Sequence, residues 1–531
     1  MSGMRHDDMR LAVRSIARLG DTDIFPYPFE NHVMNDDPDR VIGVLEGIGD
    51  DFQKSLDLYP IHAYSTLSPV THTGFRWATQ IDPFWNAYLL SLCVSLGDSI
   101  ESARVAADSR QVFSYRYAGG RSEADHIFER DGWSKFQSET RGRAANRKHV
   151  VSLDISDFYS RIYHHRLENA LNVVDPGHEA TKQIMKILSV VSGNTSYGLP
   201  VGGASSRLLA ELVLNRVDKL LKYEEVTRDY CRYADDYRFF VDSVPDAYRV
   251  IGSLSEKLQR NEGLALQKGK TRIMTSAEYL AMLSPEEPVP GSADAFMAFH
   301  IHYDPYSANA EQEFEDLKAS IKQFDVFGLL RAELRKGQVH TTLTRRLVGA
   351  LRFLESDQRG PAVLSILDNI EALAPVLPQT LRAIPDSLEG LDDKFADGVH
   401  GRIRAMLTEE HYLAQVELNR WYMLRVLATR HTVENEIAIA EHFDSAPPGL
   451  QRDIVLTLAR WGALHWLSDL KNRIGSSHPW VRRAFIIASY RLGDEGRHWR
   501  DATKSGMSPM DILIRDWAST RVNRPGWEIP L

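Results

Sequence analysis

The sequence predicts an α+β domain followed by an all-α domain. Between residues 149 and 274, short apolar stretches with the character of strands alternate with longer stretches that have helical periodicity. Beyond about residue 305 the strand pattern disappears, and helix follows helix to residue 531. A chain of this length is too long for one ordinary hydrophobic core, so we expect roughly two to four domains.

The elements of the α+β part follow from these patterns in chain order. Residues 81–107 have the apolar spacing of one long helix, and "HVVSLDI" (149–155) has the apolar character of a buried strand. We expect the remaining elements to be a helix over 156–171, a helix over about 178–191, a Gly-rich turn over 196–206, a helix over 207–223, a hairpin around 231–242, a helix over 247–263 and a strand over 264–274. An antiparallel hairpin among alternating helices and strands indicates a sheet that is covered by helices.

The helical part contains an internal repeat. "PGLQRDIVLTLARWG" (448–462) aligns with "PWVRRAFIIASYRLG" (479–493) at a spacing of 31 residues, and a weaker copy covers 418–430. Both full copies open with Pro, close with Gly and match in their apolar positions. This pattern is typical of an α-solenoid, in which each helical unit packs against its neighbours. The alternative is a chance similarity between two unrelated amphipathic helices.

Composition restricts the class of protein. The chain has 43% hydrophobic and 25% charged residues, as soluble globular proteins do, and it has no apolar run of the length of a membrane span. Its first residues lack the apolar core of a secretory signal, so we expect a cytoplasmic protein with no membrane partner. Two cysteines far apart in sequence, Cys93 and Cys231, favour buried thiols over a disulfide or a zinc site.

The charge distribution leaves room for a narrow nucleic-acid channel only. The formal net charge is −9, whereas proteins that coat nucleic acid need a broad basic surface. Two local basic clusters, "RGRAANRKH" (141–149) and "RIYHHR" (161–166), flank the predicted strand over 149–155. The alternative for each cluster is an ordinary solvated surface.

Two adjacent carboxylates, Asp235 and Asp236, lie inside the predicted hairpin "CRYADDYRFFVD". Neighbouring negative charges at a tight turn repel each other unless they face water or share a cation. A third acid, Asp154, lies at the end of the strand over 149–155. Carboxylates on neighbouring strands can hold two Mg²⁺ ions roughly 4 Å apart for nucleotidyl transfer, so we expect a two-metal site, with Mn²⁺ as a substitute. The alternative for Asp154 alone is an N-cap of the following helix.

Four segments carry a resemblance to a known family: "SLDISDFY", "GLPVGGASSRLLAELVLN", "YADD" and "GLALQKGKT". They occur in the order and approximate spacing of motifs A, B, C and D of reverse transcriptases, and the similar region covers about residues 60–275. The resemblance implies a right-hand palm with fingers elements and dNTPs as substrates. It implies that Asp154, Asp235 and Asp236 are the catalytic metal ligands and that the backbone of Ile155 lies close to the nucleotide metal.

The resemblance also assigns roles around these carboxylates. Tyr159 takes the place of the aromatic residue that abuts the sugar C2′ and excludes ribonucleotides, with an aromatic on the core face of the helix as the alternative. Lys270 matches the motif D lysine, which protonates or neutralises the pyrophosphate leaving group. Arg76 in "TGFRWA" looks like the fingers arginine that binds the triphosphate, and its alternative is a surface arginine.

The Gly-rich turn both matches and departs from the family pattern. The resemblance implies that its backbone approaches the nucleotide and the primer end, through Gly198, Pro200, Val201 and Gly202. Template-copying reverse transcriptases usually carry Gln where Val201 stands. The Phe-Leu-Gly primer grip after motif D is absent, and helical repeats follow where a thumb is usual.

This combination, with "GDTDIFPYPFENHV" near the start, resembles the AbiK-like abortive-infection and defence-associated bacterial reverse transcriptases, which include the "unknown group" enzymes. The resemblance implies phage defence, homo-oligomers, DNA synthesis often without an added template, and priming from a protein hydroxyl, which attaches the DNA product covalently. Our priming candidate is Tyr27, which lies between two prolines in an extended N-terminal stretch. The alternative is an aromatic that anchors this stretch to the palm.

We therefore expect three parts: an N-terminal segment with fingers elements over 1–148, a palm with motifs A–D over 149–304, and a HEAT-like helical repeat domain in place of a thumb over 305–531. The predicted function is an antiphage DNA polymerase that uses two-metal transfer of dNTPs. One alternative is a reverse transcriptase that copies a dedicated non-coding RNA. A less favoured one is an inactive polymerase fold that serves as a scaffold, because the three carboxylates are all retained.

Overall fold

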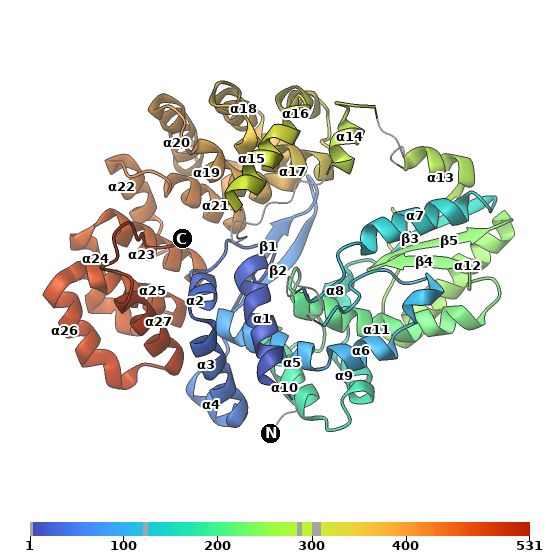
Figure 1. Cartoon of the computed structure of the whole chain (residues 1–531), viewed down its shortest axis with the longest axis horizontal. Coiled ribbons are helices and arrows are strands. Elements are labelled where there is room, and N and C mark those ends of the chain that lie inside the picture. Colours follow the sequence, from blue (N-terminus) through green and yellow to red (C-terminus); the bar gives the residue numbers. More distant parts are fainter. Residues whose placement is uncertain (1–3, 120–125, 284–288, 300–309) are drawn as a thin grey trace. The chain divides into compact units, whose positions relative to one another are not determined.

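The computed structural model describes residues 4–119, 126–283, 289–299 and 310–531 (Figure 1). The chain divides into two compact units, each built from stretches that are not adjacent in sequence. The first unit comprises Met1–Asp23, Glu30–Ala63 and Thr79–Leu283, and the second comprises Ile24–Phe29, Tyr64–Ala78 and Ser284–Leu531. The predicted boundary at 148/149 has no counterpart in this division, and the predicted boundary at 304/305 lies outside the described residues.

An antiparallel sheet forms the centre of the first unit. Its four strands lie in the order β4 (Tyr230–Tyr233), β5 (Asp236–Val241), β3 (His149–Asp154) and β6 (Arg272–Thr275). The predicted strand over 149–155 and the predicted hairpin are confirmed. The predicted strand over 264–274 is mostly wrong, because the carbonyl of Gln267 accepts hydrogen bonds from the backbone of Lys270 and Thr271 and closes a turn.

Both faces of this sheet are covered by helices, as the alternation of side chains along each strand requires. Helix α12 (Val244–Lys257) packs on one face, and α7 (Gly132–Ala144) with α13 (Ser276–Met282) packs on the other (Figure 1). The apolar cluster on the α7 side includes Phe136, Val150, Cys231, Phe240 and Tyr279. Cys93 and Cys231 are both buried free thiols.

The predicted long helix over 81–107 is two helices, α5 (Pro83–Ser95) and α6 (Gly97–Ala103). At the break, the ring of Tyr117 approaches Gly97 so closely that a Cβ there would lie 2.2 Å from it. Helix α5 is buried on nearly every side chain, and it packs against helices from both earlier and later in the unit. A helix that is apolar all round belongs in the middle of a core.

The predicted helix over 156–171 is also divided, into α8 (Phe158–Arg161) and α9 (His164–Val174). Between them Ile162 is extended, and its carbonyl accepts a hydrogen bond of 2.9 Å from the backbone N–H of Gly198. The other helices of the first unit are α1 His6–Leu19, α2 Glu30–Asp36, α3 Pro38–Asp50, α4 Phe52–Leu58, α10 Glu179–Val191 and α11 Ala204–Tyr223.

The second unit is mainly helical. Its part before residue 284 includes most of a hairpin formed by β1 (Ala63–Pro69) and β2 (Phe75–Ile81). Its helices are α14 Ala293–Ala298, α15 Ala310–Ile321, α16 Val326–Leu334, α17 Thr341–Ala350, α18 Ser356–Asp368, α19 Leu377–Leu388, α20 Asp393–Thr408, α21 Glu417–Leu427, α22 Val433–Glu441, α23 Pro448–Trp461, α24 Leu464–Arg473, α25 Pro479–Ala488, α26 Gly493–Thr503 and α27 Pro509–Ser519. Within 289–299 and 310–531 there is no strand.

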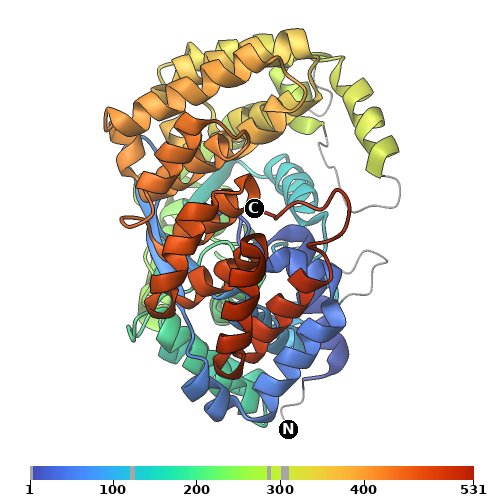
Figure 2. The ribbon, with the colours of Figure 1, turned by 90° about the vertical axis from the view of Figure 1, so that its left-hand side faces the viewer.

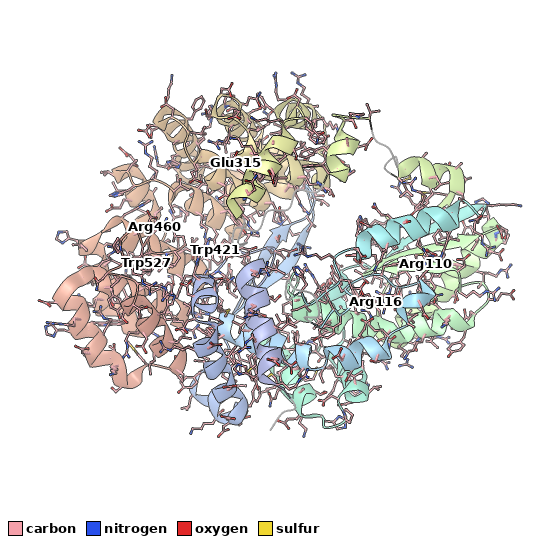
Figure 3. The ribbon with its side chains drawn as sticks, viewed as in Figure 1. Arg110, Arg116, Glu315, Trp421, Arg460 and Trp527 are labelled. Carbon is pink, nitrogen blue, oxygen red and sulfur yellow. The ribbon has the colours of Figure 1, made fainter. Side chains whose placement is uncertain are left out.

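Two segments from the N-terminal part of the chain complete the core of this unit beside α21. The ring of Phe25 lies 5.9 Å from the ring of Trp421 (Figure 3) and 6.3 Å from that of Tyr64. The carboxylate of Glu417 accepts hydrogen bonds from the hydroxyl groups of Tyr64 and Thr66. The hairpin and the segment Ile24–Phe29 are therefore structural parts of the helical unit.

The two copies of the sequence repeat form α23 and α25. These helices pack against each other, and α25 also packs against α27, as Figure 2 shows at the orange-to-red end of the chain. The matched apolar residues Val455 and Ile486 are buried in both copies. Gly462, which closes the first copy, ends α23 with a φ of 76° in the left-handed region that favours glycine.

Among the described residues, no single helix is long and apolar enough to cross a membrane, although α18 together with Ile370–Leu388 meets the length and composition limits as a pair bent by 89°.

Candidate active site

The structure places the three predicted metal carboxylates at one end of the central sheet. Asp154 is the last residue of β3 and Asp236 is the first residue of β5, and the two are direct partners in the antiparallel ladder. Asp235 precedes Asp236 in the turn between β4 and β5. Strand pairing thus brings together acids that are far apart in sequence.

The turn between β4 and β5 has a strained backbone. Ala234 has a φ of 52°, a left-handed conformation that is unfavourable for a residue with a Cβ. The guanidinium of Arg232 donates a hydrogen bond of 2.9 Å to the carbonyl of Ala234. The backbone N–H of Ile155 donates one of 3.2 Å to the carbonyl of Asp235. The second bond ties the turn to the end of β3, next to Asp154.

The electrostatics of the three acids favour a bound cation. Burial, and then the charges of Asp154 and Asp236, raise the pKa of Asp235 to about 6. Asp236 also forms an ion pair of 3.3 Å with Arg238. Because a divalent cation reverses the repulsion that raises such a pKa, this arrangement is suited to a metal site.

Lys270 lies at the same end of the sheet. Its Nζ donates a hydrogen bond of 2.9 Å to Oδ2 of Asp154, while its side chain is 66% exposed. Partial burial opposes the charge, but the hydrogen bond and the negative charge of Asp154 outweigh it, so the pKa of Lys270 is raised. Lys270 therefore stays protonated near neutral pH and holds a proton beside the carboxylates.

The donor set fits a magnesium site in its chemistry, because carboxylate oxygens and backbone carbonyls are the ligands that Mg²⁺ and Mn²⁺ prefer. In the part of the chain that the structure describes, no three or more His, Cys, Asp and Glu side chains are grouped closely enough to hold a metal ion as they stand. Lys270 and Arg238 each hold an oxygen of one of the acids, so a metal ion would compete with these two side chains. The residues that would hold the metal are Asp154, Asp235 and Asp236, and the contribution of the Ile155 backbone stays a prediction.

Tyr159 lies on α8, just after the end of β3, and is half-buried. Its carbonyl accepts a hydrogen bond of 2.8 Å from the backbone N–H of Leu199, which fixes α8 against the Gly-rich turn. Burial raises the pKa of Tyr159 well above its usual range, and Arg207 and Asp235 are among the charged groups close enough to act on it. The phenol is therefore neutral and close to the acids, and its role in sugar selection stays a prediction.

The Gly-rich turn lies before α11 and contains Gly198, Pro200, Val201 and Gly202. Gly198 and Gly202 have φ values of 102° and 100°. A Cβ on Gly202 would lie 2.4 Å from Oδ1 of Asp23 and 2.7 Å from Oγ1 of Thr22, and this same Oγ1 donates a hydrogen bond to the carbonyl of Val201. Gly202 therefore also allows the turn to pack against Thr22 and Asp23, a role that the sequence does not predict.

The other two predicted site residues belong to the second unit. Arg76 lies on β2 and is half-buried. Tyr27 lies in the segment Ile24–Phe29, where the guanidinium of Arg382 lies 4.4 Å from the centroid of its ring. Arg425 donates a hydrogen bond of 2.8 Å to the carbonyl of Tyr27. Arg76 and Tyr27 are therefore not in the same compact unit as the carboxylates.

A buried charged network behind the carboxylate turn was not predicted. Arg232 is fully buried, and it forms ion pairs with Glu211 and Asp218 of α11. Glu211 also pairs with Arg104. Arg104 in turn pairs with Glu101, which also pairs with Arg116 (labelled in Figure 3). The available signal was the sequence "LLAELVLNRVDKLL", in which the two acids lie two helical turns apart among apolar residues and so share the buried face.

Two further residues of the site were also missed, Tyr115 and Arg207. Tyr115 has a φ of 44°, and its ring lies 5.9 Å from the ring of Tyr233, which precedes the acidic turn. The guanidinium of Arg207 lies 5.2 Å from the centroid of the Tyr115 ring and 3.6 Å from a carboxylate oxygen of Asp23. Arg207 and Asp235 both act electrostatically on Tyr115, and a guanidinium is the type of group that binds phosphate oxygens.

Residues 103–284 match the family model described as reverse transcriptase (RNA-dependent DNA polymerase). The chain contains a reverse transcriptase domain. The protein is accordingly an enzyme of the reverse transcriptase and nucleotidyltransferase class. The reverse transcriptase domain starts at the end of α6 and includes the whole central sheet, with Asp154, Asp235, Asp236 and Lys270.

The sequence matches none of the curated proteins. Among solved structures, one that is similar is telomerase from Candida albicans in complex with the TWJ fragment of telomeric RNA, at 10% sequence identity and a TM-score of 0.30. That alignment covers 72% of this chain and 70% of the telomerase chain.

Proposed function

We propose that the protein is an antiphage-defence DNA polymerase that joins dNTPs by two-metal nucleotidyl transfer. The observation that carries the proposal is the pairing of Asp154 with Asp236 beside the half-buried Asp235, inside the reverse transcriptase domain. Two Mg²⁺ ions, or Mn²⁺ in their place, would activate the attacking hydroxyl and stabilise the triphosphate when bound to these acids.

The chain's own side chains orient the substrate and move protons in this proposal. Lys270 holds a proton at Nζ, 2.9 Å from Asp154, and donates it to the leaving pyrophosphate. Tyr159 forms the wall that collides with a 2′-hydroxyl. Arg76 contacts the triphosphate in the proposal drawn from the fingers resemblance, and Arg207 is a second candidate because it belongs to the same unit as the carboxylates.

The finer classification as an AbiK-like defence enzyme is also a proposal. It is supported by the sequence resemblance, by Val201 in place of the usual Gln, and by a largely helical region in place of a thumb. In this proposal the packed helices α23 and α25 belong to a HEAT-like array, and the protein is a cytoplasmic homo-oligomer.

Synthesis starts from a protein hydroxyl in this proposal, and the DNA stays covalently attached. Tyr27 is the candidate residue. Its contacts with Arg382 and Arg425 also suit the alternative role, in which the ring anchors the N-terminal segment, here to the helical unit.

One predicted RNA-contact surface argues against the alternative function, a reverse transcriptase that copies a non-coding RNA. In the basic cluster over 141–149, Arg143 and Arg147 both form ion pairs with Asp229, and Arg147 also pairs with Asp242. The protein's own acids thus partly neutralise the cluster, which lowers its attraction for RNA phosphates.

The proposed function is tested by incubating the purified protein with Mg²⁺ and labelled dNTPs, without template or primer, and sequencing the product. We expect DNA that needs Mg²⁺ and that is absent with a variant in which Asp235 and Asp236 are Asn. Synthesis only with an added RNA would support the RNA-copying alternative. No synthesis with RNA or DNA templates, with or without primers, would reject the polymerase activity.

A further inference from the structure

The turn between β4 and β5, called here the acidic turn because it carries Asp235 and Asp236, needs support from the rest of the fold. Its backbone conformation and its charges are both unfavourable. Ala234 is in the left-handed region, and Asp235 and Asp236 follow it directly. Asp236 faces Asp154 across the ladder, so three carboxylates gather at this strand end. A turn of this kind persists only where neighbouring groups hold it.

Arg232 is placed to hold the turn from behind. Its side chain is fully buried, and one nitrogen, Nη1, donates to the carbonyl of Ala234 at 2.9 Å and to Oε1 of Glu211 at 3.1 Å. Its other nitrogens bond to Asp218, with Nε at 2.9 Å from Oδ1 and Nη2 at 2.6 Å from Oδ2. The guanidinium therefore links the backbone of the turn to two acids on α11.

The acids that orient Arg232 are themselves fixed. Glu211 also pairs with Arg104 and accepts a hydrogen bond from the hydroxyl of Ser114. Burial opposes the charge on Arg232, but Asp218 and Glu211 outweigh it, and the pKa of Arg232 is raised well above its usual range. Its five donors point in fixed directions, so lysine, with one rotating ammonium, cannot make the same set of bonds.

We propose that Arg232 is a positioning residue that holds the carboxylate turn in its left-handed, metal-competent conformation by anchoring the Ala234 carbonyl to Glu211 and Asp218 of α11. The inference rests on the proposed metal role of Asp235 and Asp236. It adds that the guanidinium of Arg232 couples α11, the helix after the Gly-rich turn, to the turn that carries Asp235 and Asp236. Loss of the anchor lets Ala234 leave the left-handed region and carries the two acids away from Asp154.

The first test measures metal binding without nucleotides, as the Mn²⁺ concentration that gives half of the maximal rise in thermal unfolding midpoint. For Arg232→Lys we expect this concentration to increase about tenfold or more, the usual effect of losing a charged hydrogen bond. The matched control is Arg452→Lys. Arg452 is also fully buried and ion-paired, but it lies in α23 of the second unit, so that variant should unfold at lower temperature with unchanged Mn²⁺ dependence.

A rescue separates positioning from general destabilisation. Glycine adopts the left-handed conformation without the Cβ penalty, so Ala234→Gly in the Arg232→Lys background should recover Mn²⁺ affinity by about threefold or more. If Arg232→Lys does not fold, Arg232→Met combined with Asp218→Asn removes one charge of each sign from the core. This pair should fold and show the same weak Mn²⁺ binding.

The outcomes distinguish the inference from the proposed function. If the wild-type protein synthesises DNA and a folded Arg232 variant keeps wild-type Mn²⁺ affinity, the inference is overturned and the function stands. If the glycine substitution gives no recovery, Arg232 acts on overall stability and the inference is again overturned. A third outcome is that the wild-type protein binds Mn²⁺ through Asp235 and Asp236, that Arg232→Lys weakens this binding as expected, and that no template yields DNA. In that case the positioning role stands and the polymerase proposal fails.

Discussion

Asp154 and Asp236 are direct partners across the ladder between β3 and β5, the two inner strands of the sheet. Inner strands have hydrogen-bonded neighbours on both sides, so the backbone sets the positions of these acids. Their carboxylates contribute little to the apolar core around α7 and α12. The acids can therefore be replaced without removing the interactions that hold the sheet.

Replacing both Asp235 and Asp236 with Ala should abolish DNA synthesis and phage protection while the protein stays folded. Loss of the metal ligands removes several kcal/mol of transition-state stabilisation, which lowers the rate by about a thousandfold or more. Labelled-dNTP incorporation, phage plating and circular dichroism measure the three properties. The control is Asp242→Ala just beyond the other end of β5, where the acid pairs with Arg147 outside the site. A soluble double variant that still protects cells would reject the proposed site.

Tyr159→Ala should raise the use of ribonucleotides relative to dNTPs by about tenfold, or about 1.4 kcal/mol, because the ring that blocks the 2′-hydroxyl is removed. Competition between labelled rNTPs and dNTPs measures the ratio. Tyr163→Ala is the control, since Tyr163 is 43% exposed in the segment between α8 and α9. An unchanged ratio in the Tyr159 variant would show that this residue has a packing role only.

The contribution of Asp235 to the stability of the metal-free protein should fall as pH rises from about 4 through about 6. The pKa of Asp235 in the fold is about 6, above its usual value of about 3.9, so the native state binds this proton more tightly than the unfolded state. The stabilising contribution is present at low pH and is lost as the carboxyl ionises. A bound cation displaces the proton, so Mn²⁺ should raise the unfolding midpoint more at about pH 7.5 than at about pH 5.5.

Thermal unfolding at both pH values checks this, and Asp235→Asn should remove most of the difference. Equal effects of Mn²⁺ at the two pH values would contradict the electrostatic description of the site.

Glu417→Ala should destabilise the second unit by about 1–3 kcal/mol, because the hydroxyls of Tyr64 and Thr66 lose their shared, half-buried acceptor. Differential scanning calorimetry measures the loss. Glu409→Ala, at an exposed residue just after α20, is the control and should change little. If the two variants melt alike, the hairpin is held by the ring contacts of Tyr64 with Trp421 and Phe25.

The DNA product should migrate with the denatured protein until protease is added, because the proposal attaches it to a protein hydroxyl. Tyr27→Phe should remove this attachment, since phenylalanine keeps the ring beside Arg382 and lacks the nucleophile. Labelled product on denaturing gels measures it, with Tyr248→Phe at an exposed tyrosine as the control. Free DNA before protease would reject protein priming, whereas attachment that persists in Tyr27→Phe would reject only this residue.

The strands and acids of the site could be predicted because their signals are local. An apolar run that ends in Asp154 and a hairpin that contains adjacent acids are visible without knowledge of any partner. The helix boundaries could not be predicted in the same way. The break before Gly97 depends on the Tyr117 ring, and the break at Ile162 depends on a hydrogen bond from a residue in the Gly-rich turn.

The charged residues behind the site depend on tertiary structure even more. Arg232 in a strand pattern is equally compatible with an exposed position, and its burial follows only from the acids of α11 that lie beside it. The assignment of the hairpin to the helical unit depends on a contact between Tyr64 and Glu417, which are 353 residues apart. No window of the sequence contains both ends of such a contact.

The interleaving of the two units has a consequence for biosynthesis. Phe25 and Tyr64 emerge from the ribosome early, but α21, whose Trp421 contacts both rings, is made 353 residues after Tyr64. At roughly 5–20 residues per second, these apolar side chains wait about 20–70 s for their partners. During that interval the nascent chain exposes an incomplete core, so we expect chaperones that cover the N-terminal segment until translation has passed α21 to raise its yield in the cell.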